Sequence, residues 1–307
     1  TDAIFWIASQ SKSITAAAFM MLVQEGSVKL DDPVEKFLPE FKEQKVKVDG
    51  ELRKPRHPIT VREILSHTSG LPFSTPAEKP TLDTLTLKEA VKSYAEAPLL
   101  FEPGTKYQYS NAGINTAGRI IEVVSGMPYE DFLQKRLFDP LFMKDTTFWP
   151  NEEQLKRLAK SYKPNATKDG LEETKIGQLQ YPLSDRKRQP MPAGGLFSTA
   201  SDVAKFCQML MNGGKRGMIR FLSDDAVKQM TMKQTGDEVK ENYGLGWSVN
   251  GNGFGHGGAF STNMSVDTKR GLITVWMVQH AGYPGDGSKS HGVFVTEAMK
   301  VFGEGKK

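Results

Sequence analysis

The stretch of sequence that decides the fold is Phe5-Trp6-Ile7-Ala8-Ser9-Gln10-Ser11-Lys12. The residues at positions 16–23 are all apolar, which is typical of a helix buried on every side. We therefore predict a helix over Ser9–Glu25, with Gly26 as its C-terminal stop. A spacing of three residues places Ser9 and Lys12 on the same face of this helix, at its N-terminal end.

Ser9 and Lys12 are a candidate nucleophile and its base. A serine hydroxyl is a poor nucleophile until a base takes its proton, and a desolvated lysine can have a pKa low enough to help. The free amides of a helix N-terminus also favour an oxyanion at that end. Ser-x-x-Lys is common by chance, however, and this pair alone favours a plainer interpretation as a capping serine and a solvated lysine.

A second motif is Tyr109-Ser110-Asn111, which directly precedes a predicted helix. A tyrosine held between cations can have a pKa low enough to act as a general base, and it can then return the proton as an acid. The amide of Asn111 can hold Lys12 or a substrate carbonyl. Taken alone, the motif is equally consistent with a packed tyrosine and an asparagine helix cap.

The third motif is His256-Gly257-Gly258-Ala259. Glycines at such a place let another backbone or a ligand come close. The amide of Ala259 could then join the amide of Ser9 in an oxyanion hole. The alternative is a glycine-rich turn that carries an exposed histidine.

The order of these three motifs makes the chain similar to the penicillin-recognising serine hydrolases, in the group of class C β-lactamases and family VIII carboxylesterases. Tyr-x-Asn in the middle position points to the class C branch. The resemblance covers essentially the whole chain. It is supported by the segments Phe5-Trp6-Ile7-Ala8-Ser9, Leu65-Ser66-His67-Thr68-Ser69-Gly70-Leu71-Pro72, Phe101-Glu102-Pro103-Gly104, Gly194-Gly195-Leu196-Phe197-Ser198-Thr199 and Tyr243-Gly244-Leu245-Gly246-Trp247.

The resemblance implies a role for each motif residue. Ser9 would attack the substrate, and Lys12 and Tyr109 would move protons. The residues implied in substrate binding or the oxyanion hole, besides the Ser9 amide, are Asn111, His256, Gly258 and Ala259. His67 lies in a stretch that the resemblance places away from the chemistry, so we interpret it as structural.

The fold class implied is α+β, β-lactamase/transpeptidase-like. Residues 1–60 and 195–307 would form an antiparallel sheet flanked by the Ser9 helix and the C-terminal helix. Residues 61–194 would form a mainly helical region that carries Tyr109. Members of this group have two strands before the nucleophile segment, so we expect the sheet to lack strands and to expose an edge.

Local patterns predict further elements. Thr86 and Glu89 form a capping-box pattern for a helix that Pro98 ends. Further helices are expected over Asn111–Ser125, Ser201–Met211 and Ser288–Phe302, and one after a Ser223 cap. Strands are expected over Tyr243–Val249, Thr262–Asp267 and Leu272–Gln279, the last two joined by a hairpin turn.

Composition excludes several functional classes. The 307 residues include 40 basic and 36 acidic ones, and the net charge of +4 is spread along the chain, which argues against a nucleic-acid partner. No apolar run is long enough for an integral membrane segment. Cys207 is the single cysteine, so no intrachain disulfide forms, and its helical neighbours indicate a buried hydrophobe. Oligomeric state stays open, and a full-length bacterial protein would be periplasmic or secreted.

The function expected is acyl-enzyme hydrolysis of small carboxylic esters. The chain has His256-Gly257-Gly258 where class C β-lactamases have Lys-Thr-Gly, which removes a cation and a hydroxyl suited to a substrate carboxylate. The alternatives are a β-lactamase or D,D-peptidase-like enzyme on amide or lactam substrates, and a non-catalytic binding protein on the same fold. A Ser-His-Asp hydrolase is disfavoured because the sequence contains no Gly-x-Ser-x-Gly. No metal or organic cofactor is implied.

Overall fold

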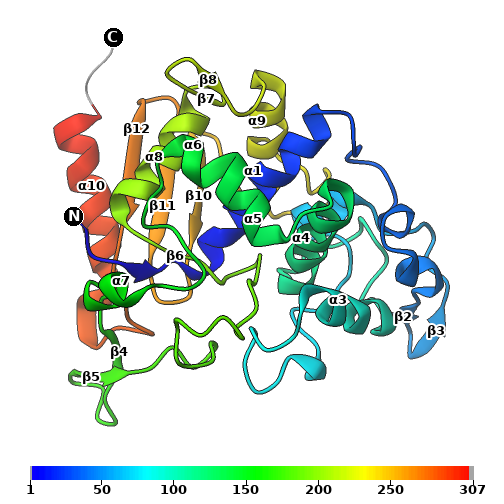
Figure 1. Ribbon diagram of the computed structural model, residues 1–307, viewed down its shortest axis with the longest axis horizontal. Coiled ribbons are helices and arrows are strands. Elements are labelled where there is room, and N and C mark those ends of the chain that lie inside the picture. Colours follow the sequence, from blue (N-terminus) through cyan, green and yellow to red (C-terminus); the bar gives the residue numbers. More distant parts are fainter. Residues whose placement is uncertain (1, 304–307) are drawn as a thin grey trace.

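The computed structural model describes residues 2–303 and has a four-stranded antiparallel sheet in the order β12-β11-β10-β9 (Figure 1). The strands are β9 (Ser248–Asn250), β10 (Gly253–Gly257), β11 (Asn263–Asp267) and β12 (Leu272–Trp276). Asp267 pairs with Leu272 across the last turn, so the predicted hairpin is confirmed.

Two helices cover opposite faces of this sheet. Side chains alternate along a strand. Ile273 and Val275 therefore point to one face, where they line a hollow with α8 (Ala200–Met211). Trp276 points to the other face, and its ring lies 5.1 Å from that of Phe294 in α10 (Ser290–Phe302). The helix that packs along β11 and β12 is thus α8 and not the predicted Ser9 helix.

The predicted Ser9 helix is confirmed as a short 3-10 turn, η1 (Ala8–Gln10), that continues into α1 (Ser11–Gln24). Every residue of α1 from Ser11 to Leu22 is buried, as expected for a helix that is apolar nearly all round. It packs between α4 (Asn111–Ser125) and α9 (Asp224–Thr231) (Figure 1). The helix therefore carries Ser9 to the junction between the sheet and the helical region.

Capping residues define the ends of the helices in the helical region, including α4, which begins within the Tyr109-Ser110-Asn111 motif. The Ser110 side chain accepts from the amide of Gly113, and Gly126 ends α4 in the left-handed region at φ +68°, so the predicted bounds are confirmed. The capping box of Thr86 and Glu89 is also confirmed. The other helices are α2 (Val61–Ser66), α3 (Leu87–Glu96), α5 (Tyr129–Leu133), α6 (Asp139–Leu141), α7 (Glu152–Lys156) and the short π-helix η5 (Gln134–Phe138).

Short two-stranded pieces complete the structure. They are β1 (Phe5–Trp6) with β6 (Phe197–Ser198), β2 (Val46–Val48) with β3 (Glu51–Arg53), β4 (Ser161–Pro164) with β5 (Leu171–Thr174), and β7 (Lys215–Arg216) with β8 (Ile219–Arg220). The remaining 3-10 turns are η2 (Val34–Lys36), η3 (Pro39–Glu43), η4 (Pro76–Glu78) and η6 (Gly285–Lys289). Within residues 2–303, no helix is both long and apolar enough to cross a bilayer.

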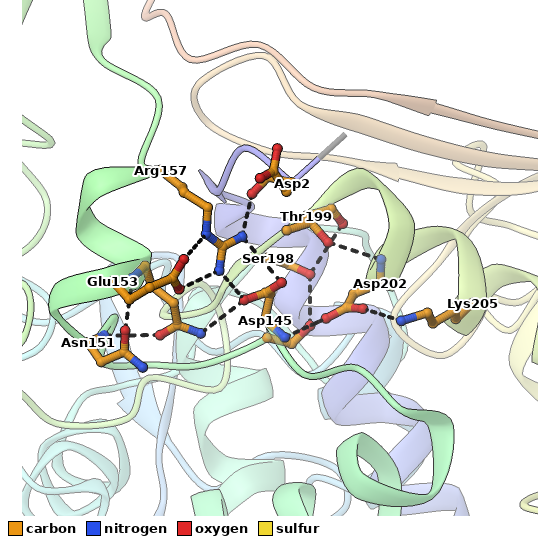
Figure 2. A network of polar contacts seen from close by, with 11 residues as sticks. Asp2, Asp145, Asn151, Glu153, Arg157, Ser198, Thr199, Asp202 and Lys205 are labelled. Atoms are coloured by element: carbon orange, nitrogen blue, oxygen red, sulfur yellow. Dashed lines mark hydrogen bonds and ion pairs between the residues drawn. The ribbon is translucent and has the colours of Figure 1, made fainter.

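A polar network supports β1, the strand that leads to Ser9 (Figure 2). Arg157, just after α7, bonds to the carboxylate of Asp145 and to the backbone carbonyl of Asp2. The amide of Asp145 in turn donates to Asp202 at the start of α8, at 2.8 Å. The network therefore ties the segment before β1 to α7 and α8.

One predicted strand was mostly wrong, and one strand, β10, was missed. Of the predicted strand Tyr243–Val249, only Ser248 and Val249 lie in a strand, as part of β9. Gly246 sits at φ +72°, and a Cβ there would lie 2.8 Å from the carbonyl oxygen of Lys12. This segment is a loop pressed onto α1. Conversely, His256 and Gly257 lie within β10 and not in a turn.

Candidate active site

Ser9 is held by its neighbours in a fixed position. β1 pairs with β6 just before it, and Trp6 Nε1 donates to the carbonyl of Gly194 at 2.6 Å. Ala8 has a φ of +46°, a left-handed conformation that costs a non-glycine residue about 1–3 kcal/mol. The surrounding contacts must stabilise this turn, and it presents the half-buried Ser9 side chain to a cavity.

Lys12 is a buried amine beside Ser9. Its Nζ lies 3.1 Å from Ser9 Oγ and donates to the carbonyl of Ala193 at 2.6 Å. The residue is fully buried, and burial lowers its pKa well below the usual value of 10.5. The amine is thus able to be neutral and basic next to the hydroxyl.

Tyr109 lies next to both Ser9 and Lys12. Lys12 Nζ lies 4.7 Å from the centre of its ring. Burial raises the pKa of Tyr109 above its usual value, and a hydrogen bond with Ser9 acts in the opposite direction without cancelling this effect. The expectation that cations lower the pKa of Tyr109 was therefore wrong. The side chain is a neutral phenol, suited to donate a proton and not to take the first one.

The turn after β10 places the Ala259 amide at the same cavity as Ser9. A Cβ on Gly258 would lie 2.6 Å from the carbonyl oxygen of Ile7 and 2.2 Å from Thr262 Oγ1. Glycine is therefore needed for the turn to approach the segment just before Ser9 this closely. The Ala259 amide has no hydrogen-bond partner among residues 2–303, and the Ser9 amide lies in the first helical turn. Ser9 and Ala259 thus line one cavity with amides that are suited to bind an oxyanion.

His256 lies beside Tyr109, with 6.1 Å between the ring centres, but both of its nitrogens are occupied. Nε2 is 3.0 Å from the hydroxyl of Tyr243, and Nδ1 is 2.7 Å from the carbonyl of Gly257. Burial, and then the nearby Lys12, lower its pKa to about 4. The ring is therefore neutral at pH 7 and has no nitrogen left for a substrate.

His67 is closer to the chemistry than the sequence suggested. Its ring centre lies 4.6 Å from that of Tyr109, and its Nδ1 accepts from the amide of Ser110 at 3.2 Å. Placing this histidine away from the site was wrong. Burial lowers its pKa well below 6.5, so the ring is neutral.

Ser9 opens onto a small cavity of about 130 Å³. Asn111 lines it, and in the described part of the chain the amide of this side chain has no hydrogen-bond partner. Trp6, from β1 just before Ser9, also lines it. No motif pointed to the other side chains, which come from loops far apart in the sequence: Phe73, Leu82, Gln178 and Met191. A hollow of about 620 Å³ near the C-terminal end of α1 contains none of the candidate residues.

A buried ion pair holds two of the loops that form the cavity wall. Arg188 Nε donates to Asp83 Oδ2 at 2.7 Å, and the two side chains are 2% and 0% exposed. Next to this pair, the amide of Leu82 donates to the carbonyl of Gln178 at 3.0 Å. Removing either partner would leave the other charge buried and unpaired, which is strongly destabilising. The ion pair therefore stabilises the loops that carry Leu82 and Gln178 into the cavity wall.

Comparisons with known proteins show what the chain is similar to. A family model described as "Beta-lactamase" matches residues 1–294. The chain is 27% identical over 303 residues to a Salmonella agona (strain SL483) protein named "Putative D-alanyl-D-alanine carboxypeptidase", covering 87% of this chain and 67% of that protein.

Two solved structures share the fold over nearly the whole chain. One is EstCE1, described as a hydrolase with promiscuous acyltransferase activity, with a TM-score of 0.79, 24% identity, and coverage of 96% of this chain and 84% of that one. The other is unliganded simvastatin synthase (LovD) from Aspergillus terreus, with a TM-score of 0.81, 20% identity, and coverage of 99% and 85%.

Proposed function

The chain belongs to the beta-lactamase family, and from this premise we propose that it hydrolyses small, uncharged carboxylic esters through an acyl-enzyme on Ser9. The predicted β-lactamase/transpeptidase-like fold is confirmed, and the family to which the chain belongs is one of serine hydrolases. The ester substrate and the residue roles are the proposal. The observation that carries it is the buried Lys12 amine 3.1 Å from Ser9 Oγ.

Lys12 is the general base of the first step. Its lowered pKa leaves the amine free to take the Ser9 proton as Oγ attacks the ester carbonyl. The hydrogen bond from Nζ to the Ala193 carbonyl holds the amine toward the hydroxyl while it acts. The amides of Ser9 and Ala259 stabilise the oxyanion that forms on the former carbonyl oxygen.

Tyr109 serves the leaving group. As the C–O bond of the tetrahedral intermediate breaks, the neutral phenol donates its proton to the departing alkoxide, and the Lys12 ammonium restores that proton. Water then attacks the acyl-enzyme and loses a proton to the same pair. The pair returns this proton to Ser9 Oγ as the bond between Oγ and the acyl carbon breaks, which frees the Ser9 hydroxyl and the carboxylic acid.

The cavity favours an uncharged acyl group. Among the described residues, those that line the cavity include no lysine or arginine, and neutral His256 has no free nitrogen to donate. Lys289 is a possible replacement cation, but it pairs with Asp286 on the exposed turn η6 at 3.0 Å. A substrate carboxylate would therefore lose a charge-assisted hydrogen bond, which is worth about 1.5–3 kcal/mol.

The volume of the cavity limits the length of the acyl chain. Apolar cavities of about 150 Å³ hold a molecule the size of benzene. The cavity here, at about 130 Å³, is slightly smaller. Acyl groups of about four to six carbons should therefore fill it, and longer chains should collide with Leu82 or Met191.

Steady-state kinetics on four substrate classes tests this function. We expect kcat/KM to be highest for nitrophenyl butyrate or hexanoate and to fall for the decanoate. A cephalosporin and a D-alanyl-D-alanine peptide should be turned over at least tenfold less efficiently, since each needs a partner for its carboxylate. A cephalosporin or peptide that equals the best ester would replace the proposed substrate class with the β-lactamase or carboxypeptidase alternative.

A further inference from the structure

Three buried side chains from separate parts of the chain form a continuous row of hydrogen bonds beneath Tyr109. His67 ends α2, Tyr243 lies in the loop pressed onto α1, and His256 lies in β10. His67 Nε2 is 3.3 Å from the Tyr243 hydroxyl, which is 3.0 Å from His256 Nε2. All three are at most 7% exposed.

The two ends of the row fix the direction of every bond in it. The amide of Ser110 can only donate, so His67 Nδ1 must accept. At the other end the Gly257 carbonyl can only accept, so His256 Nδ1 must carry a proton. Because both rings are neutral, His67 Nε2 donates to Tyr243, and the Tyr243 hydroxyl donates to His256 Nε2. The directions derived from the two ends agree.

At its His67 end, the row of hydrogen bonds contacts Tyr109 and the backbone of Ser110, and the proposed mechanism needs Tyr109 in a fixed position. The His67 ring packs on the Tyr109 ring, and its Nδ1 holds the backbone of the next residue, Ser110. If His67 carried its proton on Nδ1 instead, that nitrogen and the Ser110 amide would be two donors facing each other. The tautomer of His67 therefore determines whether the Tyr109 segment can keep its position.

We propose that His67, Tyr243 and His256 form a one-way hydrogen-bond relay that positions Tyr109 over Ser9 and Lys12, a role that rests on the proposed function. His256 is accordingly a positioning residue and not a substrate ligand. The three relay residues act through Tyr109 and touch no reacting atom.

The tautomers are the direct test, and they need no substrate. Long-range nitrogen–proton spectra of the imidazoles at neutral pH report which nitrogen carries the proton, and His67→Gln and His256→Gln variants assign the signals. We expect a proton on Nε2 of His67 and on Nδ1 of His256. The opposite tautomer at either ring, or a charged ring, would overturn the relay.

Tyr243→Phe removes the central hydroxyl and keeps the ring. Its kcat for the best ester should fall about tenfold or more with KM nearly unchanged, since misplaced catalytic groups lose transition-state stabilisation. The resonances of both Nε2 atoms should move together. Tyr107→Phe is the matched control, because Tyr107 packs on His67 and Tyr243 but its hydroxyl has no hydrogen-bond partner in residues 2–303.

The possible failures are distinguishable. Wild-type kcat in Tyr243→Phe, or an equal loss in Tyr107→Phe, would contradict the positioning role. If the wild-type protein shows the expected tautomers but hydrolyses no ester, the proposed function fails and the positioning role fails with it, while the hydrogen-bond directions stand. If Tyr243→Phe does not fold, the wild-type spectra still decide the directions.

Discussion

The side-chain oxygen of Asn115 accepts a hydrogen bond from the backbone amide of Ala193 at 3.0 Å. The carbonyl of the same alanine accepts from Lys12 Nζ. On its other side, the Asn115 amide donates to the Tyr94 hydroxyl at 3.0 Å, and that hydroxyl donates to Glu78 at 2.6 Å. A buried polar row therefore aims the Ala193 carbonyl at the proposed base.

Replacing Asn115 with alanine should harm both stability and turnover. Asn115 is 2% exposed, and its loss leaves the Ala193 amide and the Tyr94 hydroxyl without one partner each. We expect a loss of about 1–3 kcal/mol in the free energy of unfolding and a fall in kcat of about tenfold. Thr116→Val is the control, since the Thr116 hydroxyl bonds only within α4. Chemical denaturation and ester kinetics on both variants would measure the difference, and an equal effect would argue against a role for Asn115.

Replacing the adjacent residues Gly257 and Gly258 with alanine should have very different effects. Gly258→Ala places a Cβ 2.6 Å from the Ile7 carbonyl oxygen, so the turn that carries the Ala259 amide must move. We expect about 1–3 kcal/mol of destabilisation and a fall in kcat of about a hundredfold, the size expected for a displaced oxyanion donor. At Gly257 the nearest atoms are 3.7 Å away, so Gly257→Ala should be nearly silent. Thermal melting with ester kinetics checks both, and a silent Gly258→Ala would refute the proposed oxyanion site.

Lys12 and Tyr109 should behave as one unit in catalysis. We expect Lys12→Ala and Tyr109→Phe each to lower kcat by about 10²–10⁴-fold, the usual effect of general acid–base groups. The double variant should lower kcat by a factor much smaller than the product of the two single-variant factors, because one proton path needs both groups. Strictly multiplicative losses in kcat would show that the two residues act independently.

The free energy of unfolding should decrease as the pH is lowered, because His256 is buried in its neutral form. Its pKa is about 4 in the folded protein and 6.5 in an ordinary environment. Between these values the unfolded chain binds a proton that the folded chain does not, so the free energy of unfolding decreases as the pH falls from 6.5 towards 4. The loss should be on the order of 3 kcal/mol, at about 1.4 kcal/mol for each pH unit.

Urea unfolding at about pH 7.5 and about pH 4.5 measures this dependence. A His256→Asn variant should lose less stability than the wild-type protein over the same interval. Part of the decrease should remain in the variant, because burial lowers the pKa of His67 in the same direction. An identical loss in both proteins would mean that His256 is not held neutral by the fold.

The helices were predictable because local signals mark their ends. Ser110 and Gly126 bound α4 where expected, and the apolar run after Ser9 predicted a fully buried helix. The strand β10 was missed because Gly253, Gly255 and Gly257 dilute its pattern. Two of these glycines are required by backbone proximity, because a Cβ on Gly253 would lie 1.9 Å from the carbonyl oxygen of Val266 and a Cβ on Gly255 would lie 2.7 Å from that of Met264.

The candidate site was predictable only in part. Ser9, Lys12, Tyr109 and Ala259 follow from motifs, and the structure brings them together. The pKa of Tyr109 was misjudged because burial, which no motif encodes, raises it more than the hydrogen bond with Ser9 lowers it. The place of His67 depends on its contact with Tyr243, which is 176 residues away in the sequence.

The most direct test of the account is the site of covalent labelling by a fluorophosphonate ester probe. Trypsin cleaves after Lys12 and has no site within residues 1–11, so Ser9 and Ser11 are released in the same peptide, where tandem mass spectrometry can distinguish them. Ser11 is buried, and its hydroxyl accepts the amide of Leu196, so it should not react. We predict a label on Ser9 that disappears in Ser9→Ala and persists in Ser11→Ala. A label on any other residue, or undiminished labelling of Ser9→Ala, would contradict the assignment of Ser9 as the nucleophile.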